Sequence, residues 1–299
     1  MAQAVTMKGF RGTVQRAVTL PFRYGTSTAR IRRCLDGIVA LCDRWDLTPT
    51  IPVTMSVLER HPELVSSLKG VDVAVHGFQH LAYSGLTVAE QAEDMDAALD
   101  VVNMSRLAVR GFRAPYLRTD HNTLALLRSR GFLFDSSVPN YALPRGYRFA
   151  SKLMELIRIR YGPVLERAIR EPAGTGVMEL PVSLPDDELL IDALRIRNPR
   201  MLFSIFEAML ASAKARSSML VLQVHPERYH VFANALELVL QRASDEGAWK
   251  ASLSEAAEWI LRGARSSRDW PNGHAFALAI TGDLDAAALG DFAPRVGWG

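Results

Sequence analysis

Short runs of apolar and β-branched residues alternate with longer segments of helical periodicity along the chain. Such runs, bounded by turn residues, predict buried strands, and the segments between them predict helices that cover the sheet. The predicted strands lie at residues 17–22, 48–54, 71–75, 109–112, 132–135, 176–180, 219–224 and 276–281. The predicted helices lie at about residues 30–45, 56–69, 87–107, 120–130, 199–215, 229–245 and 252–264. This alternation indicates repeated βα units and predicts an α/β fold with a barrel-like sheet.

The sequence also predicts where one helix begins and where the alternation stops. Thr87, with Glu90 three residues later, has the spacing of a capping box and predicts a helix start. Residues 141–175 interrupt the alternation with prolines, glycines and a basic helical piece. We therefore predict a single barrel domain over residues 1–299, with an insertion at about 141–175 over one barrel face.

The composition is that of a globular protein. Of the 299 residues, 48% are hydrophobic and 22% are charged, and the mean hydropathy is +0.04. These values exclude disordered, collagen-like and disulfide-scaffold proteins. The formal net charge of +3 is small for this length, so nucleic acid is not an expected partner. Nothing in the sequence indicates the oligomeric state.

The chain shows no sign of export or membrane insertion. No stretch approaches the roughly 18 to 20 uncharged apolar residues that a membrane span requires, and residues 1–19 lack an apolar core followed by a cleavage site. A cytoplasmic location is therefore expected. Cys34 and Cys42, if they share one helix, lie about 12 Å apart along its axis, which is too far for a disulfide. Both are expected to be buried apolar residues.

Two interpretations fit the basic residues of the predicted insertion. A basic helical surface can contact a phosphate-bearing lipid carrier or glycan, which makes peripheral membrane contact possible. Arginine spaced among apolar residues is also the pattern of a solvated amphipathic helix. The residues concerned are Arg145, Arg148, Lys152, Arg158, Arg160, Arg167 and Arg170.

Two histidines directly follow predicted strands. His76 comes after the strand at 71–75, and His225 comes after the strand at 219–224. In α/β folds the carboxyl ends of parallel strands converge on the active site. His80 follows His76 by four residues, so a helical turn over 77–83 would let both imidazoles bind one metal ion. The alternative is a pair of histidines that are hydrogen-bonded in a loop.

Polar residues follow two further predicted strands. Arg113 and Pro115 lie just after the strand at 109–112, where a guanidinium can orient a carboxylate and a proline can fix the loop. The alternative is an arginine that closes an ordinary turn. Asp186 and Asp187 follow a later strand, and their simplest interpretation is a solvated polar loop.

In this order, the motifs resemble those of the polysaccharide deacetylases, the NodB-like carbohydrate esterase family four. The matching segments are HGFQH at 76–80, RAPY at 113–116, ELPVSLPDD at 179–187 and VHPER at 224–228. They are similar to the family's H-x-x-x-H metal motif, its R-x-P-Y motif, the segment before its late histidine, and the late histidine motif itself. The resemblance covers roughly residues 17–265 and implies a distorted (β/α) barrel.

The resemblance also implies roles for individual residues. The family binds a divalent metal through two histidines and one aspartate, which implies His76 and His80 as ligands. Arg113 would orient the catalytic aspartate, and His225 would be the general acid for the leaving amine. Pro115 and Tyr116 would shape the substrate groove, with the backbone N–H of Tyr116 as an oxyanion donor.

The first motif of the family is altered in this chain. Members begin with a strand that ends in T-F-D-D-G, whose first aspartate is the general base and whose second binds the metal. The aligned residues 19–25 read TLPFRYG, with Arg23 and Tyr24 in place of the two acids. Arg23 would bring a permanent positive charge beside a dication. Catalytic activity is therefore an open question at this point.

The end of the chain offers a replacement for the missing acids. An apolar strand pattern at 275–281 leads into TGDLD, which ends with Asp283 and Asp285. We expect the last strand to enter the barrel beside the first one, with Asp283 as the base and Asp285 as the metal ligand. The alternative is that Asp283 caps a final helix over 284–292.

These observations predict a metal-dependent hydrolase. Its expected reaction removes an N-acetyl or similar acyl group from an amino sugar in a glycan or glycolipid headgroup. Zinc is the expected ion for a site with two histidines, one aspartate and open positions. Two alternatives are a non-catalytic glycan-binding member of the fold without a functional metal site, and an amidase or deformylase that acts on another small amide.

Overall fold

The computed structural model describes residues 23–144, 146–147, 150–162, 164, 176–263 and 269–292. Its strands are β1 (Thr50–Val53), β2 (Asp72–Val75), β3 (Val109–Phe112), β4 (Phe134–Asp135), β5 (Pro139–Tyr141), β6 (Met178–Glu179), β7 (Val182–Leu184), β8 (Met219–Gln223), β9 (Ala248–Lys250) and β10 (Phe276–Thr281). Its α-helices are α2 (Ala29–Asp43), α3 (Met55–Arg60), α4 (Val88–Ser105), α5 (His121–Ser129), α6 (Ala150–Tyr161), α7 (Pro199–Ala215), α8 (Tyr229–Asp245) and α9 (Leu253–Leu261). The predicted strand at 17–22 lies outside the described residues.

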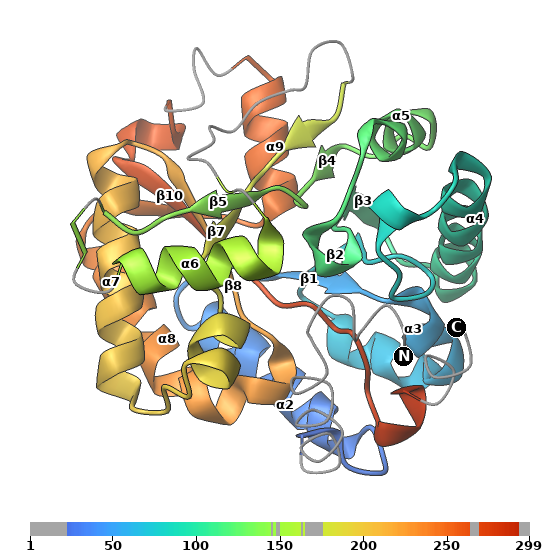
Figure 1. Cartoon of the computed structure of the whole chain (residues 1–299), viewed down its shortest axis with the longest axis horizontal. Helices are drawn as coiled ribbons and strands as arrows, with labels where there is room; N and C mark the ends of the chain where they lie inside the picture. Colours follow the sequence, from blue (N-terminus) through green and yellow to red (C-terminus); the bar gives the residue numbers. More distant parts are fainter. Residues whose placement is uncertain are drawn as a thin grey trace.

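The strands form one curled sheet with helices around it (Figure 1). Their order is β5-β7-β8-β10-β1-β2-β3-β4-β6, all pairs are parallel, and β9 also pairs with β10. This is the distorted (β/α) barrel that the alternating pattern and the resemblance predicted. The C-terminal β10 lies in the middle of the sheet, between β8 and β1, as expected for a last strand that enters beside the first.

The two ends of the strand order lie close together in the curled sheet, because the chain passes directly from one end to the other. β6 pairs with β4 at one end of the strand order, whereas β7 pairs with β5 and β8 at the other. Only Leu180 and Pro181 separate β6 from β7. Pro181 cannot donate a ladder hydrogen bond, so it ends the first strand. The sequence pattern therefore predicted one strand at 176–180 and missed β7, as it missed the short β5 and β9.

The helices largely follow the predicted periodicity. Thr87 and Glu90 form the expected capping box at the start of α4. The helix predicted over 56–69 is divided, because α3 ends before His61 and a 3₁₀ helix covers Pro62–Leu68. Pro62 disfavours the α conformation at the preceding residue, and His61 has φ −132° and ψ 63°.

β10 is buried on both faces. Its Leu278 and Ile280 pack into the large cluster formed with α7 and α8, whereas Ala277 and Ala279 face a second cluster inside the barrel. Such two-sided burial is typical of a central parallel strand. A strand from the end of the chain is thus part of the core, and the residues that follow it are brought to the carboxyl edge of the sheet.

The last described segment does not form the helix considered for 284–292. Leu284 instead forms a parallel bridge with Val53, and only Leu289–Phe292 forms a 3₁₀ turn. The alternative in which Asp283 caps a final helix is therefore wrong. Cys34 and Cys42 are free and buried, as predicted, and burial raises the pKa of Cys42 to about 12.

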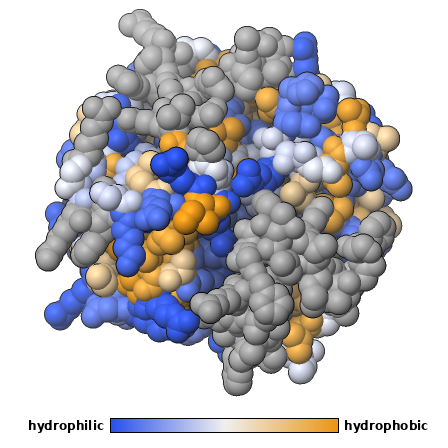
Figure 2. Space-filling model, in the orientation of Figure 1, coloured by the Kyte–Doolittle hydropathy of each residue, from blue (hydrophilic) through white to orange (hydrophobic). Residues whose placement is uncertain are grey.

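The surface shows no membrane-spanning feature within the described ranges. None of the helices there is both long enough and apolar enough to cross a bilayer. Figure 2 shows hydrophilic and hydrophobic residues interspersed on the face that is viewed in Figure 1. Scattered apolar exposure of this kind is ordinary for a protein surface.

Candidate active site

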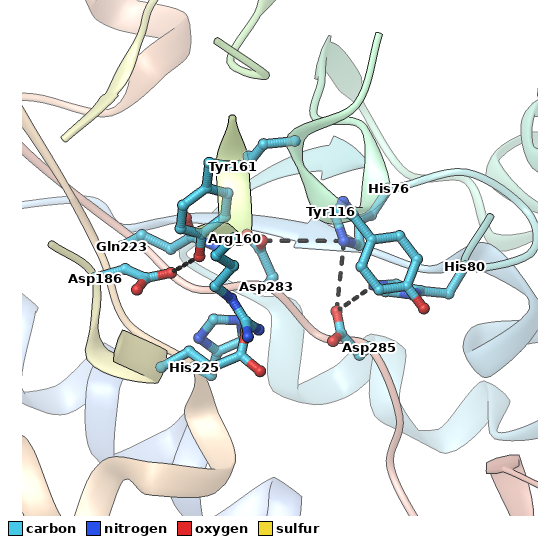
Figure 3. A pocket seen from close by; sticks show the side chains of 12 residues that line it. His76, His80, Tyr116, Arg160, Tyr161, Asp186, Gln223, His225, Asp283 and Asp285 are labelled. Atoms are coloured by element: carbon cyan, nitrogen blue, oxygen red, sulfur yellow. Dashed lines mark hydrogen bonds and ion pairs between the residues drawn. The ribbon is translucent and has the colours of Figure 1, made fainter. Parts of the chain in front are cut away.

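A small cavity lies beside the carboxyl ends of the central strands (Figure 3). Its volume is about 40 Å³. We call it the site cavity, and its lining residues are His76, His80, Tyr116, Leu117, Arg160, Tyr161, Asp186, Glu188, Gln223, His225, Asp283 and Asp285. Most of these side chains are polar, although the strands and helices that carry them pack against apolar clusters. A concentration of polar groups inside an α/β fold is the usual mark of a functional site.

His76, His80 and Asp285 form a candidate metal centre. One ligand atom from each residue lies within 4.8 Å of the others. Oδ1 of Asp285 is 3.4 Å from Nε2 of His76 and 3.3 Å from Nε2 of His80. Two ligands that bind one zinc ion at about 2.1 Å in tetrahedral geometry lie roughly 3.4 Å apart. The donor types and their spacing therefore fit a single divalent ion.

The ring of His76 is oriented for this role by a backbone carbonyl. Its Nδ1 lies 2.7 Å from the carbonyl oxygen of Arg113. A carbonyl only accepts, so Nδ1 must carry the proton and Nε2 presents its lone pair to the cavity. Partners of this kind fix the tautomer of metal-binding histidines.

The loop that carries His80 is not the helical turn considered for 77–83. Gly77 has φ +73°, and a Cβ there would lie 2.8 Å from the carbonyl oxygen of Gln79. Asp94 of α4 accepts hydrogen bonds from the backbone N–H groups of Phe78 and Gln79, each at 2.9 Å, and from the hydroxyl of Tyr83 at 2.7 Å. The loop is thus held from α4. Asp94 was not predicted, because as a helical acid it looks like a solvated residue.

The segment after β10 brings both acids to the cavity. The N–H of Gly282 donates to Thr50, and that of Leu284 donates to Pro52, so the chain continues alongside β1 in an extended form. Residues two apart on an extended chain face the same side. Asp283 and Asp285 consequently both line the site cavity.

Asp283 is held by two buried side chains. Arg113 donates from Nη1 to its Oδ1 at 2.8 Å, and Gln223 donates from Nε2 to its Oδ2 at 2.6 Å. The same Oδ2 lies 3.9 Å from Nε2 of His76. Arg113 is fully buried and also donates to Thr281 and to Ser136. Arg113 therefore orients a carboxylate, and the alternative of an ordinary turn-closing arginine is wrong.

His225 forms a buried pair with Asp187. Its Nδ1 lies 2.6 Å from Oδ1 of Asp187, and its backbone N–H donates to Oδ2 at 2.8 Å. Burial by itself disfavours the charged ring, but the Asp187 carboxylate outweighs this and raises the pKa of His225 well above its usual value. The Asp187 carboxylate therefore favours the protonated ring. Asp186 and Asp187 are both buried, so their interpretation as a solvated loop is wrong.

Helix α6 supplies two further groups that were not predicted for the site. Arg160 forms an ion pair with Glu188, and the hydroxyl of Tyr161 donates to Asp186 at 2.7 Å. In the sequence, Arg160 stands among the basic residues of the predicted insertion. The overlooked signal is helical spacing, because Ile157 is buried and positions three and four residues later share its face.

Other basic residues of the insertion are placed differently. Lys152 and Arg158 are exposed on α6, which agrees with a solvated helix face at these positions. Arg145, Arg148, Arg167 and Arg170 lie outside the described residues.

The R-x-P-Y segment contributes its tyrosine to the cavity. Pro115 is buried and begins a 3₁₀ turn, in which Tyr116 has φ 59°. The ring centre of Tyr116 lies 4.6 Å from that of His80, edge to face. Tyr116 thus packs against a candidate ligand, whereas Pro115 supports the turn from behind.

Arg23 and Tyr24 do not occupy the position of the two missing acids. Arg23 donates to Asp192, and the ring of Tyr24 packs at 5.0 Å from that of Phe292. Neither residue lines the site cavity. The expectation that Arg23 places a positive charge beside the metal ligands is therefore wrong. The sheet position beside β1 is filled by β10.

Two comparisons of sequence find similar proteins. The family model described as polysaccharide deacetylase matches residues 12–134. The peptidoglycan deacetylase-like protein FGM2 of Gibberella zeae is 33% identical over 73 residues, which is 24% of this chain and 22% of that protein. The match thus spans about a fifth of that curated relative.

Solved structures share the fold. A candidate polysaccharide deacetylase of Mycobacterium smegmatis is 20% identical, covers 87% of each chain and has a TM-score of 0.65. One from Pseudomonas aeruginosa PAO1 is 17% identical over 79% of this chain and 74% of that one, with a TM-score of 0.57. Puue allantoinase is 18% identical over 78% of this chain and 72% of that one, with a TM-score of 0.58.

Proposed function

This chain belongs to the polysaccharide deacetylase family, and from that premise we propose that it is a metal-dependent hydrolase. Its reaction is the removal of an N-acetyl or similar acyl group from an amino sugar in a glycan or glycolipid. One observation carries the proposal. The candidate ligands His76, His80 and Asp285 line the same cavity as Asp283 and His225.

The proposed ion is zinc, held by the two Nε2 atoms and by a carboxylate oxygen of Asp285. When bound, it supplies a Lewis acid for the substrate carbonyl and for a water molecule. The spacing of the three ligand atoms and the fixed tautomer of His76 support this assignment.

The chain itself supplies the proton transfers. Asp283 is oriented by hydrogen bonds from Arg113 and Gln223, and it takes a proton from the attacking water. His225 is charged through Asp187 and gives a proton from Nε2 to the departing nitrogen. The backbone N–H of Tyr116 is the proposed donor to the developing oxyanion.

Zinc titration and acetate release test the proposal. Metal-free protein is loaded with zinc, and acetate is measured with N-acetylglucosamine oligomers and with peptidoglycan fragments. We expect His225→Asn and Asp283→Asn to bind zinc like the parent while kcat/KM falls about 10²- to 10⁴-fold. Asp285→Ala should weaken zinc binding by at least about tenfold, because it removes a ligand.

His121→Asn is the matched control, because His121 is exposed at the start of α5. It should leave zinc affinity and acetate release unchanged. Undiminished zinc binding by Asp285→Ala would remove the metal centre. Glycan binding without acetate release by the zinc-loaded parent would instead support the non-catalytic alternative. Arg23, which favoured that alternative, donates to Asp192 and does not line the site cavity.

A second candidate function is hydrolysis of a ureide or another small amide. It is favoured by the structural similarity to an allantoinase. Allantoin consumption measured beside acetate release separates the two reactions, since each product is detected independently.

A further inference from the structure

A second cavity, separate from the site cavity, is lined mainly by charged side chains. Its volume is about 240 Å³. We call it the basic cavity, and its lining residues are Arg23, Arg30, Ile191, Asp192, Arg197, Glu227, Arg228, His230 and Val231. None of them lines the site cavity. The volume is several times that of a water molecule, so a small organic molecule fits.

The arginines of the basic cavity are only partly neutralised. Asp192 accepts hydrogen bonds from both Arg23 and Arg228, each at 2.8 Å, and Glu227 pairs with Arg228. Arg30 and Arg197 also line the cavity. Four guanidinium groups and two carboxylates line the cavity, and Arg228 also lies 3.8 Å from Asp187 outside it, so the lining keeps an excess of positive charge.

The guanidinium groups of Arg30 and Arg197 are available to a ligand. Within the described part of the chain, no carboxylate forms an ion pair with either of them. The Nε of Arg30 is buried and has no hydrogen-bond partner among the described residues. This Nε is closed to solvent, so a ligand would meet the terminal nitrogens of the two guanidinium groups, which form charge-assisted hydrogen bonds with anions.

His230 lies among the same arginines in this cavity. Partial burial lowers the pKa of His230, and so do the charges of Arg30, Arg197 and Arg23. These residues come from separate segments. Arg30 is on α2, Arg197 precedes α7, and His230 is on α8. The fold thus gathers cations that are distant in the sequence.

We propose that the basic cavity binds the phosphate group of a small phosphorylated molecule. Planar guanidinium groups bind phosphate oxygens in pairs, and the negative charge of a phosphate monoester complements the positive charge of the lining. Arg30 and Arg197 would contact the phosphate directly. Arg23 and Arg228 would add positive potential while they remain paired with Asp192. The proposal does not depend on the proposed hydrolase activity.

Calorimetric titration with inorganic phosphate tests this site, against chloride at matched ionic strength. We expect saturable binding of one phosphate, and at least about a tenfold loss of affinity in Arg30→Gln and in Arg197→Gln, because each change removes a charge-assisted contact. The matched controls are Arg33→Gln on α2 and Arg200→Gln on α7, which change exposed arginines outside the cavity. They should change the affinity less than twofold.

The ring resonances of His230 locate the binding site. Its surroundings include the cationic Arg23, Arg30, Arg197 and Arg228 and the anionic Asp192 and Glu227. Phosphate in the cavity should raise the pKa of His230 in the parent, and Arg30→Gln should raise it without phosphate. Absence of saturable binding, equal affinities in the cavity and control variants, or a His230 titration that is insensitive to phosphate would each overturn the proposal. Phosphate binding without any zinc or activity change would leave the hydrolase proposal untouched.

Discussion

At the scale of single residues, the charge on His225 depends on one carboxylate. Asp187→Asn removes that charge but keeps the side-chain shape. Because the carboxylate raises the pKa of His225, the variant should lose its general acid at lower pH than the parent. The protonated ring is the active form, so kcat/KM falls as pH rises through this pKa. We therefore expect the alkaline limb of the pH profile to move to lower pH in Asp187→Asn.

Asp186→Asn is the matched control for this shift. Asp186 is also buried, but it accepts hydrogen bonds from the Tyr161 hydroxyl and the Leu189 backbone N–H instead of from His225. It should leave the position of the alkaline limb unchanged, whatever it does to the rate. An alkaline limb at the same pH in Asp187→Asn and the parent would contradict the role given to His225.

At the scale of elements, the close packing of the residues that follow β10 against those that follow β8 depends on a glycine. A Cβ at Gly282 would lie 2.9 Å from the carbonyl oxygen of Val224, so Gly282→Ala must push the chain that carries Asp283 and Asp285 away from β8. We expect unfolding stability to fall by about 1–3 kcal/mol and zinc affinity to fall with it. Urea unfolding and zinc titration measure the two effects.

Gly290→Ala offers a control a few residues further along the chain. A Cβ at Gly290 would meet no heavy atom within 4 Å, and its φ is not positive. This variant should match the parent in stability and zinc affinity. Equal behaviour of the two glycine variants would show that the close approach to Val224 does not position the acids.

At the scale of the whole molecule, buried acids make the stability depend on pH. Asp135 of β4 is fully buried next to Glu179 of β6, and burial raises the pKa of Asp135 to about 6. The folded state thus holds a proton that the unfolded state releases near pH 3.9. This contribution stabilises the fold at low pH and is lost as pH rises from about 4 to 6.

Asp135→Asn isolates that contribution, because the amide does not titrate. The free energy of unfolding of the parent, taken relative to Asp135→Asn, should fall as pH increases through this window and stay constant above it. Urea unfolding at several pH values measures the difference, and the subtraction cancels the carboxylates that do not interact with Asp135. A difference that does not vary with pH would refute the raised pKa.

The sequence alone determined much of the fold and the chemical inventory of the site. Apolar periodicity set most helices and the longer strands, because each pattern is local. The positions of His76 and His225 after strands, and of two acids after the last one, predicted where chemistry would gather. The three-residue strands β5, β7 and β9 escaped, whereas the even shorter β4 and β6 lie within predicted apolar runs.

Only the tertiary structure decided which of these groups meet. The order of strands puts β10 beside β1, and that order is not encoded in local periodicity. In the folded chain Asp285 lies 3.4 Å from His76, and Arg23 donates a hydrogen bond to Asp192. Asp187 contacts His225, which is 38 residues away in the sequence. The physical reason is that burial and strand order act across the whole chain and bring separate polar residues into one site.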